Sequence, residues 1–64
     1  MINRIKQLRK AKGYRQEDLA EALDVSRQTI SAIENNKYTP TRELAMRLAR
    51  YLNTTVEDLF ELED

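Results

Sequence analysis

The sequence contains no cysteine, histidine or tryptophan, and it has one glycine and one proline. Without cysteine and histidine, disulfide bonds and the common zinc sites are excluded as sources of stability. A chain of 64 residues can bury one small hydrophobic core. We therefore expect a single domain over residues 1–64, with no metal and no cofactor, stabilised by closely packed helices and by dimerisation.

Long apolar runs are also absent. Charges at Arg4, Lys6 and Arg9 interrupt the N-terminal segment, so it lacks the apolar stretch of a signal peptide. No later segment is long and apolar enough to cross a membrane. We expect a soluble chain in the cytoplasm, with no membrane partner.

The residue types that usually carry catalysis are scarce. The chain has no cysteine nucleophile, and the serine hydroxyls, Ser26 and Ser31, have no histidine to act as their base. The adjacent acids Glu17 and Asp18 point in different directions around a helix instead of converging on a substrate. The sequence therefore predicts neither an enzyme nor a small-molecule substrate.

Charge is balanced overall, with 11 basic and 11 acidic residues, but it is unevenly distributed. Residues 1–52 carry a formal charge of +5, and residues 53–64 carry −5. A polyanion responds to the local field and not to the net charge, so this distribution permits DNA binding. It is equally compatible with a mixed surface and a solvated acidic tail.

Apolar residues recur with helical spacing along nearly the whole chain. The spacing predicts an all-α bundle of five short helices, over residues 3–12, 16–23, 26–35 and 41–52 and from 55 onwards. Their expected N-terminal caps are Asn3, Ser26, Thr41 and Thr55. Gly13 is expected to end the first helix in a left-handed conformation.

Residues 16–35 have the length of a helix-turn-helix unit, with a two-turn helix, a short turn and a second helix. Ala20 is small enough for the two helices to cross closely, and Asp24 tolerates the left-handed turn conformation. Ile30 and Ile33 form the inward face of the second helix. An ordinary helical hairpin has the same pattern, so the unit alone does not establish DNA binding.

The outward face of that second helix is short, polar and nearly uncharged, whereas a solvated face usually carries Glu and Lys. Arginine and glutamine can bond the edges of guanine and adenine, and small residues allow close approach to the groove. We therefore expect base contacts from Arg27, Gln28, Ser31 and Ala32. We expect phosphate contacts from the residues around this helix, namely Arg15, Gln16, Ser26, Asn35, Lys37 and Arg42. Taken singly, each of these polar residues is explained by hydration. Only their arrangement around one helix indicates DNA binding.

Residues 16–40, QEDLAEALDVSRQTISAIENNKYTP, resemble the phage-repressor/Cro-like (XRE) family of helix-turn-helix regulators. With LRKAKG before and ELAMRLAR after this segment, the resemblance covers nearly the whole chain. It implies a lambda-repressor-like DNA-binding domain whose third helix enters the major groove, usually as a two-fold dimer on a near-palindromic operator. The family pattern implies phosphate contacts by Gln16, Asn35 and Lys37, base contacts by Arg27, Gln28 and Ala32, and a pair between Arg9 and Glu34.

The pair between Arg9 and Glu34 is also expected from the helical wheel. Glu34 lies near the buried edge of its helix, and Arg9 lies on the rim of the apolar stripe of the first helix. A bidentate contact between them would fix the third helix relative to the first. We therefore expect this ion pair to have a structural role.

Three residues depart from the family pattern. Asp24 and Asn36 stand where glycine is usual, and both residue types tolerate positive φ. Arg15 stands where threonine or serine usually caps the second helix, so the cap is lost and a cation lies at the positive end of the helix dipole. A neighbouring phosphate would make that cation favourable, and we predict that Arg15 contacts the DNA backbone.

The C-terminal segment has more apolar residues than so short a segment can bury within one small domain. We expect some to pack inward and the rest to form a homodimer interface, with the candidates Val56, Leu59, Phe60 and Leu62. The alternatives are that they all close the core, or that they bind another protein, as in an antitoxin. The sequence thus predicts a sequence-specific regulator of transcription on double-stranded DNA, with repression favoured and activation not distinguished from it.

Overall fold

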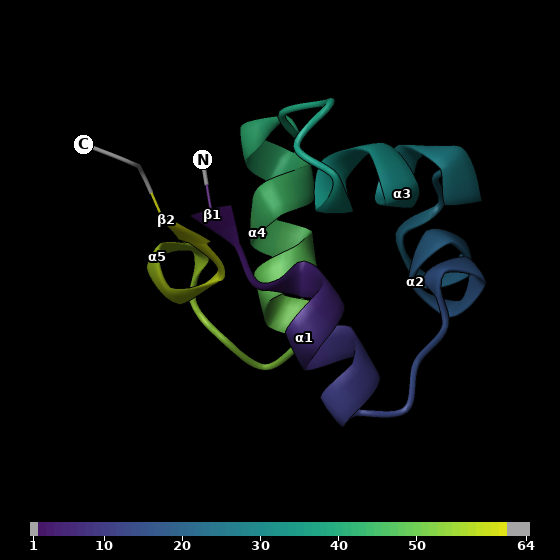
Figure 1. Cartoon of the computed structure of the whole chain (residues 1–64), viewed down its shortest axis with the longest axis horizontal. Coiled ribbons are helices and arrows are strands. Elements are labelled where there is room, and N and C mark those ends of the chain that lie inside the picture. The colour runs from purple at the N-terminus through teal and green to yellow at the C-terminus, as the bar shows by residue number, and fades with distance from the viewer. Residues whose placement is uncertain (1, 62–64) are drawn as a thin grey trace.

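The computed structural model describes residues 2–61 and shows five helices and two short strands among them. Their order is β1 (Ile2–Asn3), α1 (Ile5–Ala11), α2 (Gln16–Leu23), α3 (Arg27–Glu34), α4 (Arg42–Tyr51), α5 (Val56–Leu59) and β2 (Phe60–Glu61). In Figure 1, α4 stands between α5 on one side and the α2–α3 unit on the other, with α1 alongside. The predicted five-helix bundle is confirmed.

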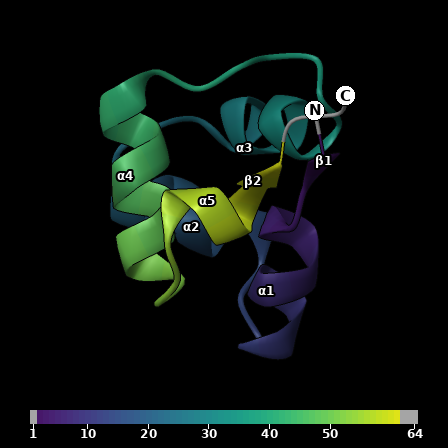
Figure 2. The same ribbon diagram turned by 90° about the vertical axis from the view of Figure 1, so that its left-hand side faces the viewer.

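The strand pair was not predicted. Ile2 lies opposite Glu61 and Asn3 opposite Phe60 in an antiparallel ladder, which brings the two ends of the described chain side by side (Figure 2). Two-residue strands are too short to produce a recognisable alternation of apolar and polar residues.

The first helix begins later than predicted. Arg4 occupies the N-cap position of α1, so the expectation that residues 3–12 are helical with Asn3 as the cap is wrong. The reason is that the backbone of Asn3 belongs to β1. Its side-chain Oδ1 still accepts a hydrogen bond from the N–H of Ile5 at 3.3 Å, as a capping group would.

Three other helices begin at the predicted caps. The hydroxyls of Ser26, Thr41 and Thr55 each accept a hydrogen bond, at 3.1–3.2 Å, from the backbone N–H three residues further on. These contacts satisfy backbone donors that have no partner inside the helix. The starts of α3, α4 and α5 are therefore encoded locally.

The first four helices end in the same way. Each is followed by a residue with φ between 58° and 75°, namely Gly13, Asp24, Asn36 and Asn53. The next N–H then bonds a carbonyl five residues back, at 2.8–3.0 Å. This is the Schellman arrangement, which satisfies the last carbonyls of the helix. The positive φ expected at Asp24 and Asn36 is confirmed.

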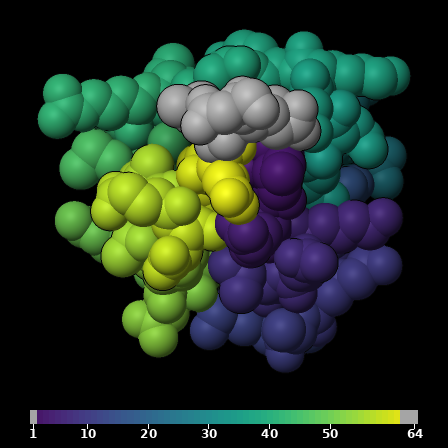
Figure 3. Space-filling view, turned by 60° about the vertical axis from the view of Figure 1, so that its left-hand side comes forward, coloured from purple at the N-terminus to yellow at the C-terminus, as the bar shows by residue number. Residues whose placement is uncertain are grey.

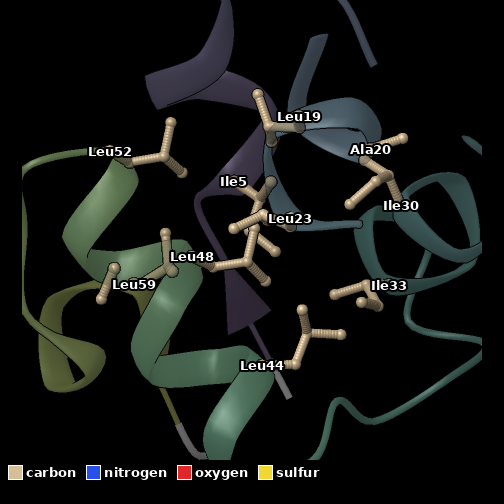
Figure 4. Packing of buried hydrophobic residues seen from close by; sticks show 11 residues of the cluster. Ile5, Leu19, Ala20, Leu23, Ile30, Ile33, Leu44, Leu48, Leu52 and Leu59 are labelled. Carbon is tan, nitrogen blue, oxygen red and sulfur yellow. The ribbon is translucent and has the colours of Figure 1, made fainter. Parts of the chain in front are cut away.

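One hydrophobic core joins all five helices (Figure 4). Its fully buried side chains are Ile5, Leu19, Ile30, Ile33, Leu48, Leu52 and Leu59. Ala20 is also buried, in the helix-turn-helix unit where α2 meets α3. Because the core clamps one face of α3, it determines which residues of that helix reach the surface.

Candidate nucleic-acid interface

Helix α3 presents one face to the core and the opposite face to solvent. Ile30 and Ile33 are 1% and 0% exposed, whereas Arg27 and Gln28 are exposed. The cap at Ser26 fixes where the helix begins, and therefore which residues fall on each face. The arrangement leaves the start of α3 open to a large ligand.

A concave hollow of about 390 Å³ lies over the outward face of α3. Seven residues line it: Gln16, Arg27, Gln28, Ser31, Ala32, Asn35 and Lys37. The fold thus brings together all four predicted base-contacting residues and three of the predicted phosphate-contacting ones. Two of the seven are cations and none is acidic, so the hollow offers positive charge and hydrogen-bonding groups in one place.

The other three predicted phosphate contacts lie outside the hollow. Arg15 and Arg27 both line a neighbouring depression, and the hydroxyl of Ser26 contacts that of Thr29 at 2.9 Å within the cap of α3. Arg42 lies on the exposed face of α4 together with Arg47. The structure therefore keeps Arg15 next to the hollow but does not bring Arg42 to it.

A nearly buried ion pair connects α1 to the end of α3. Arg9 Nε lies 2.8 Å from Glu34 Oε2, and Arg9 Nη2 donates to Oε1 at 3.3 Å. The side chains are 9% and 3% exposed. Arg9 Nη1 also donates to the carbonyl of Tyr14 at 3.0 Å. The guanidinium is thus held by several hydrogen bonds, which a buried charge requires.

Glu34 has a second partner, which the sequence did not reveal. Gln16 Nε2 donates to Glu34 Oε1 at 3.1 Å, so one carboxylate connects α1, α2 and α3. The amide of Gln16 has a second hydrogen that this contact does not use. Gln16 therefore reaches the hollow from a fixed position.

The start of α2 retains half of a capping arrangement. The Asp18 carboxylate accepts a hydrogen bond from the N–H of Arg15 at 2.7 Å. This bond, assisted by the Arg15 guanidinium, lowers the pKa of Asp18 below its usual 3.8. The Arg15 side chain makes no cap hydrogen bond, as expected, but the Asp18 carboxylate supplies the other half of a capping box by accepting from the N–H of Arg15. Arg15 also forms an exposed ion pair with Glu17 at 3.0 Å.

The C-terminal segment divides between core and surface. Leu59 is fully buried in the intramolecular core, so its assignment to a dimer interface is wrong. Val56 and Phe60 are partly buried, and Leu62 lies outside the described residues. Ile2, which is 44% exposed in the neighbouring strand, adds an apolar side chain that sequence reasoning missed.

Membrane-spanning helices and metal-binding clusters are both absent from the described residues. None of their helices is long and apolar enough to cross a membrane. Within residues 2–61, no group of three or more acidic residues is placed to hold a metal ion.

Comparison with known proteins identifies the domain. The helix-turn-helix family model matches residues 5–59. Over all 64 residues, the chain is 47% identical to an uncharacterized HTH-type transcriptional regulator of Methanocaldococcus jannaschii and 42% identical to the uncharacterized HTH-type transcriptional regulator YgzD of Bacillus subtilis, covering 97% of each.

Solved structures agree. The N-terminal DNA-binding domain of SinR from Bacillus subtilis has a TM-score of 0.81 and 34% identity, over 94% of this chain and 88% of that one. The restriction-modification controller protein C.AhdI from Aeromonas hydrophila has a TM-score of 0.81 and 30% identity, over 89% and 86%. The chain therefore belongs to the Cro/C1-type (XRE) helix-turn-helix family and is a DNA-binding transcriptional regulator.

Proposed function

We propose that this regulator reads a specific duplex sequence by inserting α3 into the major groove, and that it acts as a homodimeric repressor on a near-palindromic operator. The observation that carries the proposal is the hollow over α3, which gathers the residues suited to that contact and contains no acid. We expect such a regulator to act in the cytoplasm and to have no enzymatic activity.

The chemistry of the exposed face supports base reading. The amide of Gln28 can bond both N6 and N7 of adenine, and the guanidinium of Arg27 can bond O6 and N7 of guanine. Ser31 and Ala32 are small enough for the helix to approach the bases closely. Since Ile30 and Ile33 fix the rotation of α3, these side chains enter the groove together.

Phosphate contacts would hold the helix in register. Gln16 lies at the start of α2, and Asn35 and Lys37 lie beyond the end of α3, so the hollow has a polar anchor on each flank. Arg15 is a further candidate, after exchanging its exposed pair with Glu17 for a phosphate. Arg42 stays a weaker candidate because it lies on another face.

A homodimer would present two such helices to successive turns of the major groove. The proposed interface is the edge of the bundle at the strand pair and α5, where Ile2 is exposed and Val56 and Phe60 are partly buried. An isologous interface uses the same patch on both copies, which suits a patch at one edge of the bundle. The same exposed surface also supports the second candidate, an antitoxin-like module whose main partner is another protein. A mass measurement in solution tests the homodimer, and a pull-down from the source cell tests for a different protein partner.

Titration with DNA at several salt concentrations tests the proposal. Each phosphate contact contributes about −0.9 to the slope of log K against log salt concentration, and a specific site binds roughly 10³-fold or more tightly than random duplex. Gln28→Ala should lose discrimination at one base pair in each half-site, while Lys37→Ala should weaken binding to all sequences alike. Lys10→Ala, an exposed cation on α1, is the matched control. Failure of the parent protein to bind duplex DNA at low salt would contradict the proposal.

A further inference from the structure

The N-terminal strand contacts the far end of the recognition helix. The amide of Asn3 uses its two hydrogens separately: Nδ2 donates to the carbonyl of Ile33 and to Asn36 Oδ1, each at 2.9 Å. Its Oδ1 accepts from the N–H of Ile5. Both hydrogens and the oxygen of this side chain are therefore in use, connecting the start of α1 to the end of α3.

Asn36 is the residue that ends α3 in the left-handed conformation, with φ 59°. Its conformation turns the N–H of Lys37 back to the carbonyl of Ala32 at 2.8 Å. Asn35 is held nearby, because its Nδ2 donates to the carbonyl of Ser31 at 2.9 Å. Asn3 thus braces the turn that carries Asn35 and Lys37, the anchors on one flank of the hollow.

The strand that carries Asn3 is itself fixed by the C-terminal segment. Asn3 lies opposite Phe60, and the N–H of Arg4 donates to the carbonyl of Leu59 at 2.9 Å. The Arg4 guanidinium adds a bond to the carbonyl of Asp58 at 3.0 Å and an ion pair with Glu61 at 2.7 Å. Figure 3 shows the two segments in direct contact on the surface.

We infer that Asn3 is a positioning residue for DNA binding, which transmits the packing of the C-terminal segment to the phosphate-contacting turn at residues 35–37. The inference rests on the proposed function. Asn3 lies outside the hollow, so it acts through Asn36 and not by touching DNA. A change at β2 would then alter DNA affinity without any change on the DNA-binding face.

The test compares Asn3→Ala with Asn53→Ala in binding to a mixed-sequence DNA duplex across a salt series. Asn53 has the same left-handed conformation as Asn36 but follows α4, so its substitution also costs stability without touching α3. Asn3→Ala should weaken binding about fivefold, the equivalent of one hydrogen-bonded contact, and should flatten the salt slope by up to about 0.9. Asn53→Ala should change neither the DNA affinity nor the salt slope.

Two further measurements separate positioning from general loss of structure. In amide NMR spectra, Asn3→Ala should shift the resonances of Asn36 and Lys37, and Asn53→Ala should not. Asn36→Gly keeps the left-handed turn but removes the acceptor, so Asn3→Ala should have a smaller effect on DNA affinity in that background.

The outcomes distinguish the two proposals. An Asn3→Ala protein with the parental affinity and salt slope, or a loss equal to that of Asn53→Ala, overturns the role of Asn3 alone. A parent protein that binds no duplex DNA overturns the proposed function and this inference with it, even if the amide resonances shift.

Discussion

The guanidinium of Arg9 and the carboxylate of Glu34 meet at 2.8 Å and 3.3 Å, with almost no exposure of either side chain to water. The pair joins the first helix to the last residue of the recognition helix. Gln16 shares the same carboxylate. The carboxylate of Glu34 therefore links α3 to both α1 and α2.

Replacing one partner of this pair should be far more harmful than replacing both. Arg9→Leu or Glu34→Leu alone leaves a buried charge without its partner, and we expect a loss of about 3–5 kcal/mol in the free energy of unfolding. The double variant should recover much of that loss, because no unpaired charge remains. Urea unfolding followed by circular dichroism measures all three. Single losses below about 1 kcal/mol would show that the pair behaves like an exposed one.

The left-handed helix ends offer a second test. Asp24→Gly should raise the free energy of unfolding by about 0.5–1 kcal/mol, because glycine adopts positive φ without steric cost. Gly13→Ala should lower it by about 1–2 kcal/mol, purely through the backbone, since an added Cβ would meet no atom within 4 Å. Thermal denaturation of the two variants measures both changes in stability. Equal melting temperatures for Asp24→Gly and the parent would contradict the assignment of strain to Asp24.

The two ends of α3 show what can and cannot be predicted from the sequence. Ser26, Ile30 and Ile33 encode the start and rotation of α3 within a few residues, so the exposed face could be read from spacing. The bond between Asn3 and Asn36 spans 33 positions, and no local pattern predicts such a contact. The second partner of Glu34 was missed for the same reason.

Acid sensitivity should reveal the cap at the start of α2. The hydrogen bond from the N–H of Arg15 depresses the pKa of Asp18, so the folded state favours the ionised carboxylate. Its contribution to stability is present above the ordinary value of 3.8 and is lost as pH falls through the lower, folded-state pKa. Asp18→Asn should therefore melt below the parent at neutral pH and approach it in acid.

Glu17→Gln is the matched control for Asp18→Asn, since it removes the same charge one residue earlier and leaves the Asp18 bond intact. Its difference from the parent in melting temperature should be smaller at neutral pH. If both variants show the same pH dependence, the effect belongs to the net charge of the helix start and not to the hydrogen bond.

The proposed dimer interface makes a prediction about concentration. Ile2 is 44% exposed and lies opposite Glu61 in the strand pair, so Ile2→Ser should weaken association while leaving the monomer core intact. Each copy contributes the residue, and burying an apolar side chain is worth about 1.5–3 kcal/mol when complete. Analytical ultracentrifugation should therefore show a dissociation constant raised at least tenfold.

Met46→Ser provides the control for Ile2→Ser, because Met46 is also apolar and is 50% exposed on the outer face of α4. The Met46→Ser protein should dimerise like the parent.

DNA affinity should depend on dimerisation. Ile2→Ser should bind an operator with two half-sites much more weakly than the parent does. It should bind a single half-site like the parent, because α3 is unchanged. If Met46→Ser dissociates the dimer and Ile2→Ser does not, the interface lies on α4. The basic face that holds Arg42 would then point toward the partner copy.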